Sequence, residues 1–348
     1  MANQSVTIKD VAKAAGVSIT TVSRFLNRRY DSMSVETKQR IEQVIAKLHY
    51  QPNKMAQGLK GQSRTVAVVV VNLGYPYAVA VIRSISSVLN AAGYSLLVCE
   101  SSGDREQEAQ LLQSLMAQGV DGIIIQTSGD NNELLERIAL EKPVVLMDRQ
   151  FDIPSAINVI TDNQAASQKL TERLFEEGYR SVIYVSEPTE GLSTRELRLK
   201  GYETACDLSG ASPDVRWVLR EDPASVDALV RELAEHPPER PFTVYTANGL
   251  VMLDLYPRLV QLPYMVPTEM GLATFDEPDW VHVTSPRLTC VRQPTDEIGI
   301  AAAEAVLDRL GISEAVLDRL GITVDSTADA TRTLASEVIW NRSTTRRS

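Results

Sequence analysis

The spacing of apolar residues changes near residue 65 from a helical to a strand-like period. Before that point, apolar side chains recur at intervals of three and four residues, the period of a helix with one buried face. The pattern predicts three short helices. Their inward positions are Val11, Ala14 and Ala15, then Val22, Phe25 and Leu26, then Ile41, Val44, Ile45 and Leu48.

Polar residues at the expected helix ends support this assignment. Thr7 and Asp10 have the spacing of a capping box, and Ser18 and Ser34 precede the second and third helices. Gly16 suits the left-handed position that ends the first helix. Two helices joined by a tight glycine turn, with a third packed on them, form the helix-turn-helix plan. We therefore expect an all-α helix-turn-helix domain over residues 1–50.

Residues 51–64 are predicted to form a hinge helix and linker. Pro52 favours a helix start, yet only about seven residues follow before the glycines begin. So short a helix does not persist alone in water, and Gly58 costs it about 1 kcal/mol more. We interpret the segment as one that folds only when something holds it.

From Thr65, apolar runs bounded by loops alternate with amphipathic segments such as 104–117 and 163–177. Such alternation predicts parallel sheets covered on both faces. The stretch is too long for one sheet, so we expect an α/β body of two doubly wound parallel sheets over 65–348. The predicted N-lobe is 65–160 plus 294–325, and the C-lobe is 161–293 plus 326–348. The strand-like runs are VAVVVVNL, SLLVC, GIIIQ, PVVLMD, SVIYV, FTVYT, MGLATF and LTCVRQ.

The segment EAVLDRLGI occurs twice, at Glu304–Ile312 and Glu314–Ile322. A ten-residue step turns a helix by about 1,000°, so the second copy falls about 80° from the face of the first. We interpret the repeat as a local duplication in a surface connection rather than an interaction helix.

Charge is distributed unevenly along the chain. Residues 1–64 carry eleven Lys and Arg against four Asp and Glu, a net charge of +7, whereas the remainder carries −17. A basic head on an acidic body indicates an anionic partner for the head; a solubilising imbalance is the alternative.

Composition narrows the class of protein. Three widely separated cysteines without a CxxC pair argue against a disulfide framework or a zinc site. No apolar run approaches the ~20 residues of a membrane span, and the first residues lack a signal core. We expect a cytoplasmic protein with no cofactor.

The second predicted helix carries side chains suited to DNA. In this plan it enters the major groove with its amino-terminal residues at base edges. Ile19 suits contact with a thymine methyl group, Thr20 can donate or accept a hydrogen bond, and Arg24 suits a guanine. Small hydroxyls and amides near helix starts suit phosphate oxygens. The predicted contacts of the head are Thr7, Ser18, Ile19, Thr20, Thr21, Ser23, Arg24 and Asn27.

The head resembles the LacI/GalR family of DNA-binding regulators. TIKDVAKAAGVSITTVSRFLN nearly completes the family pattern D-V-A-x-x-A-G-V-S-x-x-T-V-S-R-x-L/V-N, and YQPNKMAQGLK is similar to the family's hinge. The resemblance implies a hinge helix at Asn53–Leu59, with Leu59 pressed into the minor groove. The implied hinge contacts are Asn53, Lys54, Ala56, Gln57 and Leu59.

The resemblance extends to the body and to assembly. It implies two lobes like a periplasmic sugar-binding protein, and a two-fold dimer that binds pseudo-palindromic operator DNA. The chain ends SEVIWNRSTTRRS without heptads, so we expect a homodimer rather than a tetramer.

Polar and aromatic residues follow the predicted strands of the body. A cleft between two α/β lobes is a natural ligand site, lined by loops at the carboxyl ends of strands. Polyols need bidentate polar groups and an aromatic platform. The predicted effector-binding residues are Tyr75, Tyr77, Gln126, Asp148, Arg149, Arg195, Arg198, Asn248, Phe275, Asp276 and Gln293; Glu100 to Ser102 and Thr127 hold similar positions.

The resemblance gives some of these residues a role. It implies that Asp148, Asn248, Asp276 and Gln293 surround the effector. The family's usual N-D pair is Asn248–Gly249 here, and the arginine expected five residues before Gly201 is Glu196. Arg195 is therefore the candidate substitute, with Arg198 as the other choice.

The hinge NKMAQGL, the segment ANGLVML and the S-x-R spacing at Ser193 and Arg195 resemble those of repressors of 2-keto-3-deoxygluconate catabolism. A charged sugar acid of that kind would explain Arg149 and Arg195 as carboxylate partners. Two alternatives remain: the effector is a neutral sugar, or it is a co-repressor that raises operator affinity instead of lowering it. The expected function is allosteric repression of carbohydrate catabolism genes.

Two other classes of protein are alternatives. An enzyme is disfavoured because no GxGxxG, P-loop or GxSxG motif is present, although Asp148 and Asp276 could form an acid–base pair. An exported receptor is disfavoured by the basic head. Steep loss of DNA affinity with salt would separate a regulator from both.

Overall fold

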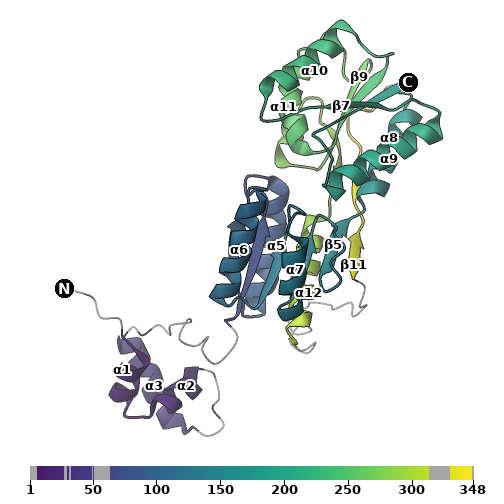
Figure 1. The fold of residues 1–348 in the computed structure, drawn as a ribbon. Helices are drawn as coiled ribbons and strands as arrows, with labels where there is room; N and C mark the ends of the chain where they lie inside the picture. The colour runs from purple at the N-terminus through teal and green to yellow at the C-terminus, as the bar shows by residue number, and fades with distance from the viewer. Residues whose placement is uncertain are drawn as a thin grey trace. The chain divides into compact units, whose positions relative to one another are not determined.

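A computed structural model of the chain describes residues 6–26, 30, 33–48, 50, 63–312 and 330–346. Two compact units, Met1–Ser63 and Arg64–Ser348, make up the chain (Figure 1). Several predictions fall outside the described residues. They are Asn27, the hinge contacts Asn53, Lys54, Ala56, Gln57 and Leu59, and the second copy of EAVLDRLGI.

The described residues of the first unit form three helices, α1 (Ile8–Ala15), α2 (Ile19–Leu26) and α3 (Val35–Leu48). Val11, Val22 and Ile41 are fully buried between them. Ala12, not Ala14, completes the inward face of α1, because Ala14 points to solvent. The fold of the head otherwise follows its apolar pattern.

The predicted helix ends of the head are present. The backbone N–H of Thr7 donates to Asp10 at 2.8 Å, as in a capping box. The Thr21 N–H donates to Ser18 Oγ at 3.1 Å, and the Thr37 N–H to Ser34 Oγ at 3.2 Å. Gly16 adopts φ +64° and closes α1.

The first sheet of the body has the order β11-β5-β4-β3-β1-β2, and every pairing is parallel. Helices cover both faces, as the prediction of a doubly wound sheet requires. One face packs on α5 (Pro76–Ala91) and α12 (Thr295–Arg309), and the other on α6 (Arg105–Gln118) and α7 (Asn132–Glu141). The strands are β1 (Thr65–Val70), β2 (Ser95–Glu100), β3 (Gly122–Ile125), β4 (Val144–Met147), β5 (Ile157–Thr161) and β11 (Thr331–Leu334).

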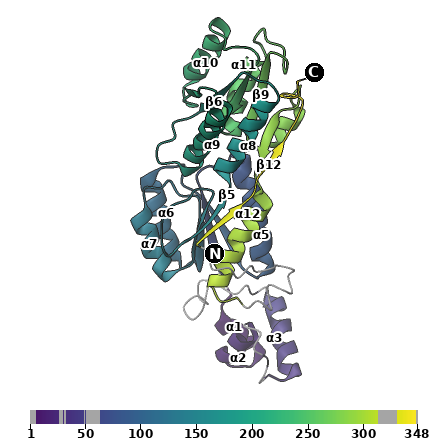
Figure 2. The same ribbon diagram turned by 90° about the vertical axis from the view of Figure 1, so that its right-hand side faces the viewer.

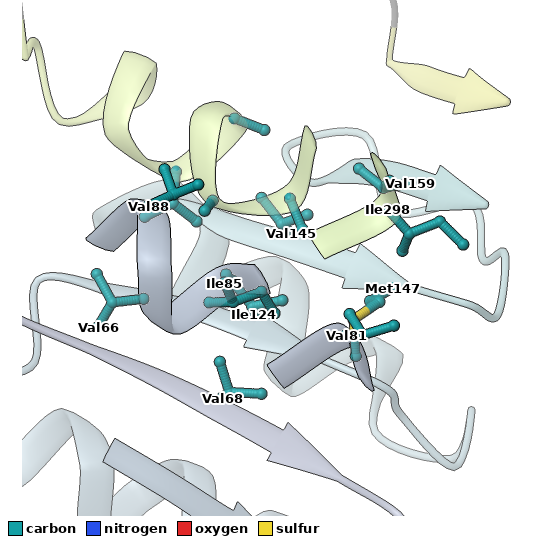
Figure 3. Packing of buried hydrophobic residues seen from close by; sticks show 14 of the residues in the cluster. Val66, Val68, Val81, Ile85, Val88, Ile124, Val145, Met147, Val159 and Ile298 are labelled. Carbon is teal, nitrogen blue, oxygen red and sulfur yellow. The ribbon is translucent and has the colours of Figure 1, made fainter. Parts of the chain in front are cut away.

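The core of this sheet follows from the period of its strands. Val66, Val68 and Val70 alternate toward α5 and α12, while Ala67 and Val69 face α6 and α7. Figure 3 shows the first of these layers, with Val81 and Ile85 of α5 over Val68 and Ile124. Figure 2 shows α5 and α12 side by side on this face.

The second sheet has the order β12-β10-β9-β8-β6-β7. One face packs on α10 (Pro223–Glu235), α11 (Gly249–Leu259) and the 3₁₀ helix η1 (Asp279–Val283). The other packs on α8 (Asn163–Glu176) and α9 (Ser193–Ser209). The strands are β6 (Ser181–Ser186), β7 (Asp214–Trp217), β8 (Phe242–Thr246), β9 (Met270–Phe275), β10 (Thr289–Arg292) and β12 (Glu337–Ile339).

The chain passes between the two sheets three times, after β5, after β10 and after β11. Residues 331–334 therefore belong to the first lobe, so the predicted assignment of 326–348 to the C-lobe is wrong for this segment. Because β12 follows β11 out of the first lobe, it enters the second sheet from the cleft. It therefore runs antiparallel to β10, whereas the other pairings are parallel.

Candidate DNA-binding and effector sites

The outward face of α2 carries the predicted base contacts. Ile19 is 44% exposed, whereas Val22, one turn on, is 0% exposed. Ser18, Thr20 and Arg24 are also exposed, and Thr21 and Ser23 are half-buried. One side of α2 is thus anchored in the core while a mixed apolar, hydroxyl and guanidinium surface faces outward.

Thr7 lies at the start of α1, where free backbone N–H groups gather. Its hydroxyl donates to Asp10 at 2.7 Å. Hydrogen bonds from the Thr7 side chain and backbone lower the pKa of Asp10. The predicted phosphate contact at Thr7 is therefore also a structural cap.

A cavity of about 360 Å³ lies between the two lobes of the body, at the carboxyl ends of their strands. Nine predicted effector-binding residues line it: Tyr75, Tyr77, Gln126, Asp148, Arg149, Arg195, Arg198, Asn248 and Gln293. Glu100 and Ser102 line it too. Phe275 is instead a fully buried core residue beneath Arg198, at 3.7 Å from the guanidinium carbon to the ring centroid.

A second cavity of about 730 Å³ adjoins the first. Tyr75, Tyr77 and Gln293 line both, and Asp276 lines only this one. Asp276 contacts Tyr75 Oη and Gln293 Nε2 and accepts from the Gly249 N–H at 3.3 Å. Tyr75 belongs to the first lobe and Asp276 to the second, so their hydrogen bond joins the lobes.

Asp148 and Asp276 share an uncommon backbone. Their φ values are +70° and +75°, in the left-handed region that few residues other than glycine, asparagine and aspartate enter. Each directly follows a buried strand. The fold therefore holds both carboxylates at the lobe junction at some cost in backbone strain.

Asp148 is buried and accepts from Gln126 Nε2 at 2.6 Å. Burial raises the pKa of Asp148, while the positive charges of Arg198 and Arg149 oppose the rise. Two further polar atoms at this cavity, Tyr77 Oη and Gln293 Oε1, are buried without a hydrogen-bond partner among the described residues. A bound polyol would supply such partners.

Arg198 is held inside the second lobe. Its Nε donates to Asn163 at 2.7 Å and its Nη1 to the Ala247 carbonyl at 2.8 Å. Burial works to lower the pKa of Arg198, but Asp276 and Asp148 outweigh it and the pKa is raised. The guanidinium is therefore a fixed positive charge beneath the cavity.

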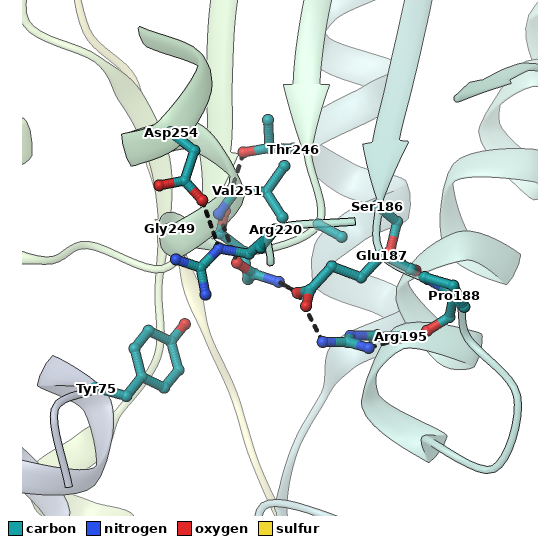
Figure 4. A network of polar contacts seen from close by, with 12 residues as sticks. Tyr75, Ser186, Glu187, Pro188, Arg195, Arg220, Thr246, Gly249, Val251 and Asp254 are labelled. Atoms are coloured by element: carbon teal, nitrogen blue, oxygen red, sulfur yellow. Dashed lines mark hydrogen bonds and ion pairs between the residues drawn. The ribbon is translucent and has the colours of Figure 1, made fainter. Parts of the chain in front are cut away.

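Glu187 organises the adjoining wall of the cavity (Figure 4). Its Oε2 accepts from Arg195 Nη2 at 2.6 Å and from Asn248 Nδ2 at 3.2 Å. Asn248 also caps α11, because its Oδ1 accepts from the Val251 N–H at 2.9 Å. Nearby, Arg220 donates to Asp254 of α11 at 2.7 Å.

Arg149 reaches the cavity from the first lobe. Its Nη1 donates to the neutral Thr127 carbonyl at 2.9 Å. Its Nε is buried without a partner among the described residues. Burial lowers the pKa of Arg149, although the charge of Asp148 opposes this.

Sequence reasoning missed seven residues that line this cavity, namely Val71, Asn72, Glu187, Thr194, Arg220, Glu221 and Leu250. Glu187 follows the run SVIYV and could have been found by the rule that found Asp148. Arg220 and Glu221 follow β7, whose residues DVRW carry no continuous apolar run, so the strand itself was missed.

A helix-turn-helix unit followed by a two-lobed body with a polar cleft defines the class of ligand-responsive, DNA-binding regulators. Residues 7–53 match the family of bacterial regulatory proteins, lacI family. Residues 63–330 match the periplasmic binding proteins and sugar binding domain of the LacI family. The chain belongs to the LacI family of DNA-binding transcriptional regulators, as the sequence predicted.

Relatives support the predicted subgroup. The chain is 33% identical over 308 residues to the HTH-type transcriptional regulator KdgR of Bacillus subtilis, covering 87% of this chain and 91% of that one. It is 36% identical over 307 residues to the HTH-type transcriptional regulator PtxS of Pseudomonas aeruginosa, covering 88% and 89%. The predicted resemblance to this subgroup is thereby confirmed.

The fold is also that of a solved regulator. A crystal structure of the Lac repressor dimer bound to operator and the anti-inducer ONPF superposes with a TM-score of 0.81 at 22% identity. The match covers 98% of this chain and 99% of that one. Within the part of the chain that the structure describes, no helix is long and apolar enough to cross a membrane.

Proposed function

We propose that the protein is a homodimeric repressor of carbohydrate catabolism genes whose affinity for a pseudo-palindromic operator is set by a sugar acid. The best candidate effector is 2-keto-3-deoxygluconate. The effector class is carried by one observation: the half-buried Arg149 lines the cavity, and its buried Nε lacks a hydrogen-bond partner among the described residues.

A carboxylate is the natural partner for such a group. Charge-assisted hydrogen bonds between arginine and carboxylate are about twice as strong as neutral ones. Arg195, the other predicted carboxylate partner, already donates to Glu187. We therefore assign the effector's carboxylate to Arg149. Its hydroxyls are assigned to Asp148, Gln293 and Tyr77, whose polar atoms converge on the same cavity.

The DNA-binding assignment rests on α2 and on family membership. The exposed Ile19, Thr20 and Arg24 are proposed to contact base edges, and Thr7, Ser18, Thr21, Ser23 and Asn27 phosphates. The hinge contacts are proposed on the family resemblance alone. The dimer, too, is proposed on the family resemblance alone.

A gel-shift experiment tests the DNA-binding proposal. The purified full chain is mixed with DNA from upstream of its own gene and with shuffled DNA, over a series of salt concentrations. We expect a preference for a symmetric sequence and a steep fall of affinity with salt. Equal binding to shuffled DNA at low salt, with no ligand and with each candidate, would rule the proposal out.

Calorimetry tests the effector. We expect 2-keto-3-deoxygluconate to bind the full chain and neutral hexoses to bind weakly or not at all. Binding of neutral sugars alone would assign the regulator to a neutral effector. Turnover of the sugar acid by the pure protein would contradict the proposal that the chain is not an enzyme. As a regulator of chromosomal genes, it would act in the cytoplasm.

The sign of regulation follows from the gel shift with effector present. We propose that the effector lowers operator affinity by changing the cleft between the lobes. An effector that instead raises operator affinity would identify a co-repressor.

A further inference from the structure

The arginines around the effector cavity differ in what they can still bind. Arg198 donates to Asn163 and to a backbone carbonyl, and Arg220 pairs with Asp254. Arg195 pairs with Glu187 at 2.6 Å. These three arginines come from the second lobe, and each is already engaged by a protein acceptor. Arg149, from the first lobe, retains an unpartnered Nε among the described residues.

Glu187 differs from the other acceptors in its position. It lines the cavity itself, as does the arginine it holds, and their side chains are only 14% and 22% exposed. A second donor, Asn248, converges on the same Oε2 atom. A carboxylate of the protein therefore occupies the place that an anionic group of a ligand would take beside Arg195 (Figure 4).

We propose that Glu187 limits the effector to one anionic group. A sugar acid with a single carboxylate binds at Arg149, whereas a second anionic group at its far end is rejected. That second group could be a phosphate ester or another carboxylate. It would lie beside the negative Glu187 and beside Arg195, whose positive charge Glu187 already neutralises. The inference rests on the proposed sugar-acid function and adds its selectivity.

Electrostatics make this discrimination substantial. Like charges within a few ångströms repel strongly in a partly dry site, and specificity commonly depends on such repulsive elements. Removing the charge of Glu187 both ends the repulsion and frees Arg195 to bind an anion. Together these effects are expected to change the relative affinity for mono- and dianionic ligands about tenfold or more.

The test compares 2-keto-3-deoxygluconate with its 6-phosphate by calorimetry at one fixed ionic strength. The full-length wild type, E187Q and E221Q are used, each checked for cooperative melting. Glu221 is the matched control. It lines the same cavity and is exposed, and no arginine contact of Glu221 is seen among the described residues. E221Q therefore removes the same charge without freeing an arginine.

We expect the wild type to prefer the unphosphorylated acid. In E187Q this preference should shrink about tenfold more than in E221Q. The double variant E187Q/R195Q should regain part of the wild-type preference, because the freed arginine is gone while the repulsion by Glu187 stays absent. A wild type that binds the phosphorylated acid equally well or better overturns the proposal without any variant. The proposal is also overturned if the preference for the unphosphorylated acid changes no more in E187Q than in E221Q.

Failure of the proposed function gives a different result. If the wild type binds neither acid but binds neutral sugars, the sugar-acid function itself is wrong. If the wild type binds the unphosphorylated acid and E187Q behaves like E221Q, only the role of Glu187 is wrong.

Discussion

Asp148 and Asp276 illustrate how single residues fix the geometry of the cleft. Both follow buried strands and both have positive φ. Left-handed backbone costs most side chains about 1–2 kcal/mol, but aspartate and asparagine tolerate it better. At each position the residue after a strand thus turns the chain sharply and presents its carboxylate at the lobe junction.

At Asp148 the effect of the backbone conformation on stability can be separated from the effect of the charge. D148N and D148A both remove the carboxylate, but only asparagine tolerates φ +70° well. We expect D148A to lower the free energy of unfolding by at least about 1 kcal/mol more than D148N, measured by chemical denaturation. Alanine loses both the tolerance of this backbone conformation and the hydrogen bond from Gln126, which the asparagine oxygen can keep. Equal stabilities would show that backbone strain at this position is negligible.

A substitution of Arg149 tests the proposed contact with the effector's carboxylate. In R149Q the effector's carboxylate loses its charged partner, so we expect affinity for the sugar acid to fall tenfold or more by calorimetry. Neutral sugars should bind as they do to the wild type. R137Q, which removes an exposed arginine of the same lobe on α7, is the control for net charge. A similar loss in R137Q would contradict the assignment.

Helices α8 and α9 pack unusually closely, and Gly201 allows this. A Cβ atom at Gly201 would lie 2.2 Å from the Gln164 carbonyl oxygen and 2.9 Å from the Gln168 amide nitrogen. Both are backbone atoms of α8, so they cannot move aside as a side chain can. The start of α9, which carries Arg195 and Arg198, is thereby held against α8, the first element of the second lobe.

Substitution of this glycine should separate the two helices. We expect G201A to lower the free energy of unfolding by about 1–3 kcal/mol, the usual cost of overpacking. K200A, one residue away on the exposed side of α9, should stay within about 0.5 kcal/mol of the wild type. Equal unfolding midpoints for G201A and K200A would refute this account of the contact.

The elements differ in how far the sequence determines them. The head was predictable because its caps and apolar spacing are local, as at Thr7, Gly16 and Ser18. The strand runs with continuous apolar residues were also predictable. Strands β5, β7, β11 and β12 were missed, because polar residues interrupt their apolar runs or leave those runs very short, as Asn158 does in β5. For β11, pairing of Thr331 with the distant Asn158 decides its place, which no local pattern reveals.

The residues of the cleft were likewise only partly predictable from local sequence. Parallel strands bring their carboxyl ends together, so a residue just after a strand is a reasonable candidate, and Asp148 and Gln126 line the cavity accordingly. That rule cannot tell which side chain turns inward to the core, as Phe275 does. Nor can it reveal that Arg195 is held by Glu187, because that contact depends on how the loop after β6 packs against the start of α9.

At the scale of the whole molecule, two ligands are expected to affect one another through the body. If effector lowers operator affinity by some factor, linkage requires operator to lower effector affinity by the same factor. We expect that factor to lie between about 5 and 150, corresponding to roughly 1–3 kcal/mol.

Reciprocity can be measured directly. Operator affinity is determined with and without saturating effector, and effector affinity with and without saturating operator, in the same buffer. The two factors should agree, and shuffled DNA should leave effector affinity nearly unchanged. Unequal factors would show that the sites are not coupled through a single equilibrium.

The late position of β11 has a consequence for synthesis. The first sheet acquires its edge strand only at Thr331–Leu334, about 170 residues after its neighbour β5 ends at Thr161. At roughly 5–20 residues per second, a ribosome needs on the order of 10–30 s to cover that interval. During that time the helix-turn-helix domain can already be folded, while the edge of β5 is still unpaired. Nascent chains tend to aggregate at such an unpaired strand edge. A message truncated before residue 331 would therefore yield a protein able to recognise DNA locally but prone to precipitate.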